Sequence, residues 1–135
     1  MPTALLALLA ALGVFLMLNG RRQAARHADP DAETLSALVR AGSDLGRPHD
    51  IEFFLYFPSR EAADQAAGQL RDEGFATAVS SSDAGDDWLC LATRTMRPTL
   101  DELQRLRRHL AAVAESRDGA YDGWGTTVTS LDGEG

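Results

Sequence analysis

The feature that most constrains this chain is a regular alternation of strand-like and helix-like periodicity between residues 51 and 129. The segment Ile51–Phe57, IEFFLYF, is apolar and aromatic and is bounded by Asp50 and Pro58, which is typical of a buried strand. Further strands are predicted over 75–81, 88–95 and 125–129, and helices over 59–73 and from Thr99 to about residue 118. Six elements in this order leave few ways to build one hydrophobic core.

The order β-α-β-β-α-β predicts an α+β fold of the ferredoxin-like kind, an antiparallel four-stranded sheet with both helices on one face. Right-handed crossovers place the first and third strands at the centre of such a sheet. The second long helix is expected to bury a stripe at helical spacing, formed by Leu100, Leu103, Leu106, Leu110, Val113 and Ala114.

A short helix is expected to precede this unit. Asp29 is its predicted N-cap, Pro30 occupies the first helical position and Gly42 ends it. Asp31 and Glu33 fall in its first turn, where the helix dipole favours anions.

The N-terminal segment Thr3–Leu18, TALLALLAALGVFLML, is uncharged and almost wholly apolar. As a helix it is about 24 Å long, a little short of the ~30 Å hydrocarbon core of a bilayer. No basic residue precedes it, whereas Arg21, Arg22 and Arg26 follow, so the positive-inside rule predicts a single-pass membrane anchor with the domain on the cytoplasmic side. A cleaved signal peptide, which implies secretion, is the competing interpretation. The predicted organisation is an anchor over 1–20, a basic linker over 21–28, a domain over 29–131 and a tail over 132–135.

The charge of the chain is uneven. The formal net charge is −7, but from residue 28 onward ten arginines stand against twenty carboxylates, a balance of −10. Such a domain is repelled by a phosphate backbone, which argues against direct nucleic-acid binding and favours a basic protein as partner. The single cysteine, Cys90, lies in an apolar run and is interpreted as a buried, inert thiol, in keeping with a reducing compartment.

No group of residues has the spacing of a catalytic or metal site, so we predict neither enzymatic activity nor a cofactor. The acidic cluster Asp83, Asp86 and Asp87 lacks the closing glutamate of a calcium loop and is interpreted as a solvated hairpin tip. The histidines are scattered, without paired spacing for zinc: His27, His49 and His109. His49 is interpreted as a plain loop residue. A small-molecule site on this scaffold requires a deep pocket beside Cys90 or His49.

The stretch Gly119–Val128, GAYDGWGTTV, carries a resemblance to a known family. Its core of Tyr121, Asp122, Gly123 and Trp124, followed by Gly125 and Thr126, resembles the ending that characterises the ribonuclease E inhibitor family typified by RraB. Weaker similarities are Gly42-Ser43-Asp44 and Ile51-Glu52. The resemblance spans about residues 29–131, and the order of elements agrees with the ferredoxin-like fold of that family.

The resemblance implies a non-catalytic, acidic protein that binds an RNA-degrading endonuclease and lowers its activity. The expected partner is then ribonuclease E or another basic protein. The apparent anchor, and the absence of a long acidic C-terminal extension, depart from the family pattern. A membrane-anchored structural or interaction domain with no nuclease connection therefore stays open as the alternative.

The motif itself is predicted to be structural, with direct partner contact as the alternative. Gly119 is expected to end the second long helix, and Asp122-Gly123 to form a turn. Trp124 then packs into the sheet or against a helix, and the last strand begins at Gly125.

Overall fold

The structure, a computed structural model, describes residues 29–82 and 85–129. In chain order its elements are α2 (Pro30–Arg40), β1 (His49–Phe57), α3 (Arg60–Asp72), β2 (Ala76–Ser81), β3 (Trp88–Met96), α4 (Leu100–Glu115) and β4 (Ala120–Gly125). The four strands form one sheet in the order β2-β3-β1-β4, and every neighbouring pair is antiparallel. The predicted β-α-β-β-α-β fold, with β1 and β3 at the centre, is therefore confirmed.

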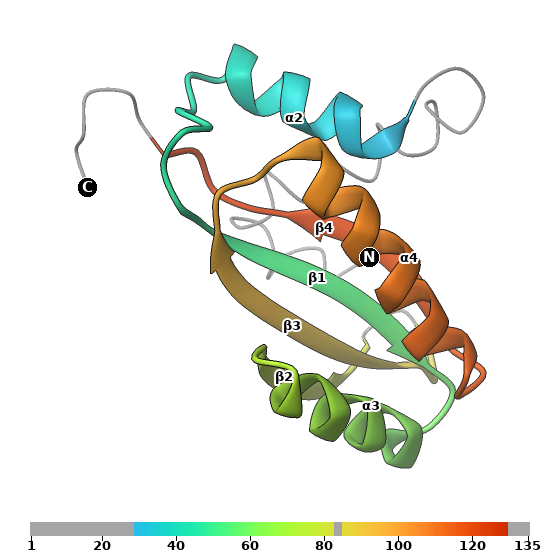
Figure 1. Cartoon of the computed structure of the whole chain (residues 1–135). Coiled ribbons are helices and arrows are strands. Elements are labelled where there is room, and N and C mark those ends of the chain that lie inside the picture. Colours follow the sequence, from blue (N-terminus) through green and yellow to red (C-terminus); the bar gives the residue numbers. More distant parts are fainter. Residues whose placement is uncertain (1–28, 83–84, 130–135) are drawn as a thin grey trace.

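Helices α3 and α4 cover the same face of the sheet (Figure 1), as predicted. The strict alternation along β1 explains why this face is apolar: Ile51, Phe53, Leu55 and Phe57 are buried beneath the helices. The remaining core is supplied chiefly by the alanine face of α3 and the leucine stripe of α4: Ala63, Ala66, Ala67, Leu70, Leu103, Leu106, Leu110, Val113 and Ala114. Small alanines let the α3 backbone lie close to the strands.

The helices begin where their capping residues predict. The side chains of Asp29, Ser59 and Thr99 each accept a hydrogen bond from a backbone N–H in the first turn of α2, α3 and α4 respectively. Each helix ends in a left-handed residue, Gly42, Gly74 or Asp118, whose φ angles are +96°, +100° and +61°. The residue after each one donates its N–H back across the last turn, the arrangement of a Schellman motif.

Gly119 does not end α4 in the way the sequence predicted, because Asp118 takes the left-handed position. A Cβ atom on Gly119 would lie 2.4 Å from the carbonyl oxygen of Tyr56 and 2.5 Å from the ring of Phe57. Gly119 is therefore required for the close approach of the chain to the end of β1.

Two further predictions, on the last strand and on the start of α4, are wrong. The last strand spans Ala120–Gly125, not 125–129, so the YDGW sequence is itself the strand. Leu100 is 36% exposed because it is the first residue of α4, ahead of the stripe that packs on the sheet.

The predicted membrane anchor and linker concern residues that the structure does not describe. The expected anchor over 1–20 and linker over 21–28 lie outside the described residues. Among residues 29–82 and 85–129, no helix has the length and apolar character needed to cross a bilayer.

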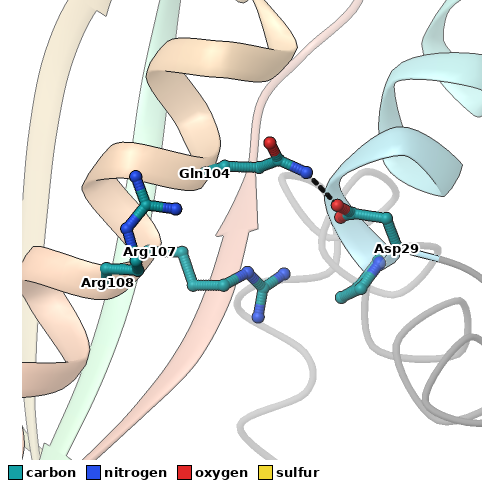
Figure 2. A pocket seen from close by; sticks show the side chains of 5 residues that line it. Asp29, Gln104, Arg107 and Arg108 are labelled. Carbon is teal, nitrogen blue, oxygen red and sulfur yellow. Dashed lines mark hydrogen bonds between the residues drawn. The ribbon is translucent and has the colours of Figure 1, made fainter.

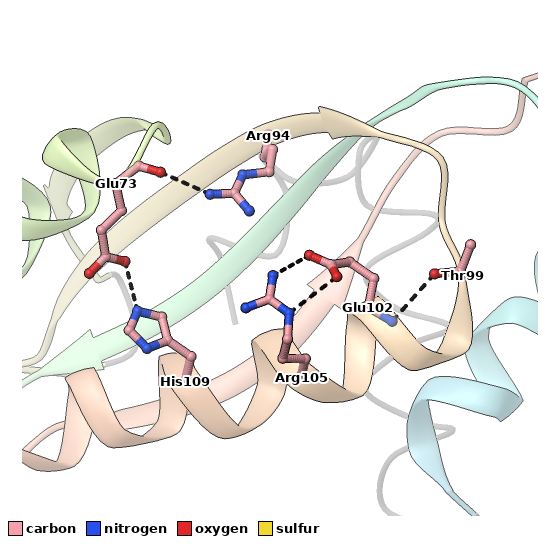
Figure 3. A network of polar contacts seen from close by, with 6 residues as sticks. All are labelled: Glu73, Arg94, Thr99, Glu102, Arg105 and His109. Carbon is pink, nitrogen blue, oxygen red and sulfur yellow. Dashed lines mark hydrogen bonds and ion pairs between the residues drawn. The ribbon is translucent and has the colours of Figure 1, made fainter.

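Polar contacts at the solvent-exposed border of the core join α3, β3 and α4 (Figure 3). The carboxylate of Glu73, at the end of α3, lies 2.7 Å from Nε2 of His109 on α4, and its backbone carbonyl accepts a hydrogen bond of 3.0 Å from Arg94 on β3. Burial alone would raise the pKa of Glu73, but hydrogen bonds to its carboxylate lower it. Along α4, Arg105 donates to Glu102 one turn earlier. The Glu73–His109 contact thus joins the end of α3 to α4 at the solvent surface.

Candidate functional site

The YDGW motif forms β4 and contains a bulge. Trp124 pairs with Phe53 and Tyr121 pairs with Leu55, so two residues of β4 lie opposite the single residue Phe54 of β1. These two residues are Asp122 and Gly123, and Gly123 has a φ of +104°. The dipeptide predicted to form a turn therefore forms a β-bulge, which keeps the strand paired on both sides.

The bulge directs Trp124 to the helix-covered face, where its side chain is 1% exposed. Its indole Nε1–H donates a hydrogen bond of 3.0 Å to Oδ1 of Asp31, on α2. A buried tryptophan needs such an acceptor because its N–H is otherwise desolvated without compensation. Trp124 thus connects the last strand to the first described helix.

Asp31 also forms an ion pair with Arg107 of α4. The guanidinium contacts the carboxylate in bidentate fashion, with Nε 2.9 Å from Oδ2 and Nη2 2.8 Å from Oδ1. The Asp31 side chain is 1% exposed and that of Arg107 is 30% exposed. Although burial alone would lower it, the pKa of Arg107 is raised by this carboxylate. We call Asp31, Arg107 and Trp124 the α2 anchor triad.

The sequence had identified only one member of this triad. It assigned Asp31 to the helix dipole, and Arg107 is not among the residues expected in the buried stripe of α4. The one local signal for Arg107 is its position next to the buried Leu106, at the border of the apolar stripe. No local signal exists for Asp31, because its partners are 76 and 93 residues away in the chain.

The hydroxyl of Tyr121 is buried beside the triad and has no hydrogen-bond partner among the described residues. Burial raises the pKa of Tyr121, and the negative charge of Asp31 raises it further. The phenol is thus neutral at physiological pH and is not prepared to act as a base.

The remaining residues of the motif lie outside the α2 anchor triad. Gly125 pairs with Glu52 across the β1–β4 ladder, and Thr126 is buried and donates its hydroxyl hydrogen to the carbonyl of Asp50, at 2.8 Å. Asp122 lies in the bulge and its charge contributes to the raised pKa of Tyr56, after the larger effect of burial. The motif therefore faces two ways: Trp124 and Thr126 are buried, whereas Asp122 is near Tyr56 on the opposite side of the sheet.

A shallow depression lies between the start of α2 and α4 (Figure 2). It is lined by Asp29, Pro30, Gln104, Arg107 and Arg108, and the amide of Gln104 donates to Asp29 across it. Three of the side chains that border it are already bound: Gln104 binds Asp29, and Arg107 is paired with Asp31. The depression is thus the outer rim of the α2 anchor triad.

A second polar cluster fixes the loop between α2 and β1, and it corrects the interpretation of His49. His49 is the first residue of β1 and is 2% exposed. Its Nδ1 lies 2.8 Å from the carbonyl oxygen of Arg47, which can only accept, so Nδ1 carries the hydrogen. Its Nε2 then accepts from the hydroxyl of Ser43 at 2.7 Å, and that hydroxyl in turn accepts the N–H of Thr129 at 2.9 Å.

The remaining candidates for a nucleophile or a metal site are Cys90 and the acidic hairpin tip. Cys90 is fully buried, and burial raises the pKa of its thiol to about 11, so it is an inert core residue as predicted. Within the described ranges, no three His, Cys, Asp or Glu side chains are grouped as metal ligands. Asp83 of the predicted hairpin tip lies outside the described residues.

The fold and the site together define a ferredoxin-like domain with an added N-terminal helix. Its YDGW residues belong to the last strand, and Trp124 of this strand binds the added helix. The sequence matches the family described as RraB, regulator of ribonuclease activity B, over residues 28–126. The chain belongs to this family, as the YDGW motif had indicated.

Two curated relatives support the assignment. A protein from Idiomarina loihiensis named regulator of ribonuclease activity B is 29% identical over 102 residues, covering 71% of this chain and 78% of the relative. A protein of the same name from Pseudoalteromonas atlantica is 29% identical over 98 residues, covering 70% of this chain and 84% of the relative.

Proposed function

We propose that this protein is a non-catalytic regulator of ribonuclease activity that acts by binding the nuclease, with ribonuclease E as the expected target. The observation that carries the proposal is the family match across residues 28–126. It is supported by the balance of −10 from residue 28 onward, which favours a protein over an RNA partner. The groups most suited to catalysis have other tasks: Cys90 is a buried thiol and Arg107 is paired with Asp31.

We further propose that the segment Thr3–Leu18 anchors the protein in the membrane with its domain in the cytoplasm. The support is the apolar character of this segment and the three arginines that follow it. The anchor places the regulator where a membrane-associated degradation machinery works. Carbonate extraction of membranes, combined with an intact-mass measurement, tests this directly. Release of the full-length chain by carbonate contradicts the anchor, and a mass that lacks the N-terminal segment indicates a cleaved signal peptide.

The regulatory function is tested in a reconstituted cleavage assay. Purified ribonuclease E is incubated with labelled RNA and the full chain in zwitterionic nanodiscs, and an unrelated acidic protein of similar charge serves as control. We expect the full chain to slow RNA cleavage and the control protein to leave it unchanged. We also expect that the full chain does not shift free RNA in a gel. Unchanged cleavage together with no binding to the nuclease refutes the proposal and leaves the alternative, an interaction domain without a nuclease connection. A shift of free RNA indicates substrate sequestration instead.

A further inference from the structure

The sheet has a second face, which neither α3 nor α4 covers. The alternation that buries Phe53 and Leu55 under the helices turns Phe54 and Tyr56 of β1 to this opposite face. The register places Leu91 beside Phe54 and Leu89 beside Tyr56 on the neighbouring strand β3. We call these four residues the open-face cluster.

The open-face cluster is a continuous apolar surface at the centre of the sheet. Each of its side chains is half-buried, so all four keep contact with solvent. Toward β2, the cluster continues into the exposed small residues Ala76 and Ala78, of which Ala78 pairs with Leu91. A contiguous apolar surface of this kind on a small domain indicates an interaction site.

The charges that border the cluster are negative. Asp50 and Glu52 lie on the same face of β1, since they alternate with the buried residues of that strand. The pKa of Glu52 is raised by burial and then by the charge of Asp50, so the two carboxylates repel each other there. Asp122 adds a third carboxylate through the bulge in β4, near enough to Tyr56 to raise its pKa.

Cationic side chains in the described strands are turned the other way. Arg94 lies over the ring of Phe75 at 3.9 Å and donates to the end of α3, and His49 is buried with both ring nitrogens bound to the loop between α2 and β1. Along the described strands, this face thus combines apolar side chains with carboxylates and carries no cationic side chain. This combination disfavours RNA and anionic lipid, and also a second copy of the chain, whose own carboxylates would face these.

We infer that the open-face cluster with its carboxylate rim is the docking surface for the ribonuclease, and that it takes a nuclease segment presenting apolar side chains flanked by arginine or lysine. The inference rests on the proposed function and specifies the site and the partner chemistry. The apolar residues provide the desolvated centre of the contact, and Asp50, Glu52 and Asp122 provide a rim that selects a cationic partner.

The test compares matched variants of the full chain in zwitterionic nanodiscs. The double variant Asp50→Lys, Glu52→Lys reverses the rim, and Asp72→Lys, Glu115→Lys makes the same charge change at exposed positions at the ends of α3 and α4. We expect the rim variant to raise the Kd for ribonuclease E at least about tenfold and to restore RNA cleavage, while the control stays within about twofold. The difference should shrink at high salt, because exposed charges are screened.

A second pair of variants tests the apolar centre independently of charge. Leu91→Ser removes a member of the cluster, and Val39→Ser removes a side chain on α2 that is 54% exposed. We expect Leu91→Ser to weaken binding about tenfold and Val39→Ser to leave it unchanged. Thermal melting of each variant shows that the domain is folded, so a loss of binding reports the surface itself.

The outcomes separate this inference from the proposed function. If the wild type binds the nuclease and both open-face variants bind equally well, the inference is wrong and the proposed function stands. If the wild type does not bind at all, both are wrong. If light scattering shows a dimer of the wild type that the Leu91→Ser variant dissolves, the face is an interface between copies of this chain, which also overturns the inference.

Discussion

Replacing Asp31 by alanine removes the centre of the α2 anchor triad and should strongly destabilise the domain. The substitution leaves Arg107 without its bidentate partner and the indole N–H of Trp124 without an acceptor. Breaking a fully buried ion pair from one side costs about 3–5 kcal/mol. Because the Arg107 side chain is 30% exposed, its stranded charge keeps some hydration, and we take about 2–3 kcal/mol for this part.

The unsatisfied indole N–H adds about 1 kcal/mol or more. Since one carboxylate serves both donors, the two losses overlap, and we expect a total of about 3–4 kcal/mol. That is a large part of the stability of a domain of this size, which is about 5–15 kcal/mol. The melting temperature should fall by about 15–25 °C. Asp31→Asn retains an oxygen acceptor while losing the charge, so we expect about half the effect.

Urea unfolding followed by tryptophan fluorescence and by far-ultraviolet circular dichroism measures these differences, and coincident transitions show that unfolding is two-state. Glu33→Ala is the matched control, because Glu33 is an exposed carboxylate in the same helical turn. It should cost no more than about 0.5 kcal/mol. A double-mutant cycle with Arg107→Met should show a coupling of about 1 kcal/mol or more. An Asp31→Ala variant as stable as the control, or a cycle without coupling, refutes the proposal that the triad holds α2.

Three further predictions each concern a single residue. Gly119→Ala should destabilise the domain by about 2–3 kcal/mol in the same urea assay, because the new methyl group meets the backbone of Tyr56; an effect below that of an ordinary surface substitution contradicts the close approach. Glu52→Gln should raise the melting temperature at pH 7: the folded-state pKa of Glu52 is raised by burial and by Asp50, so ionisation costs stability as pH rises through it. The gain should vanish below about pH 4, where Glu52 is protonated in both states, and a gain that is independent of pH contradicts the assignment. Cys90, with a pKa of about 11, should resist alkylation at pH 8 in the folded protein and react fully in urea, as followed by mass spectrometry; rapid labelling of the folded protein excludes a buried thiol.

Much of the fold could be predicted because its determinants are local. The N-caps Asp29, Ser59 and Thr99 lie within three residues of the N–H groups that they accept from. The alternation of IEFFLYF likewise identified β1 and the face that it buries. Capping and periodicity are properties of a short window, so a single sequence is enough to locate such elements.

The position of β4 could not be obtained in this way. A glycine with positive φ after an aspartate occurs both in turns and in bulges, and the two differ only in what lies opposite. Here Phe54 of β1 lies opposite, which is a matter of register between strands far apart in the chain. The same limit applies to His49, whose burial depends on Ser43 and on the chain near Thr129.

The bulge is also what connects the interior of this domain to its proposed binding surface. In a regular strand alternate residues share a face, but the extra residue at Asp122-Gly123 changes this relation within β4. Trp124 and Tyr121 thereby both lie on the helix side, where Trp124 holds Asp31, while Asp122 lies opposite Phe54 on the open face. A short motif can thus fix the first helix and place a carboxylate at the rim of the open-face cluster. On this account the YDGW sequence serves recognition through the strand geometry that it imposes, and its tryptophan stays in the core.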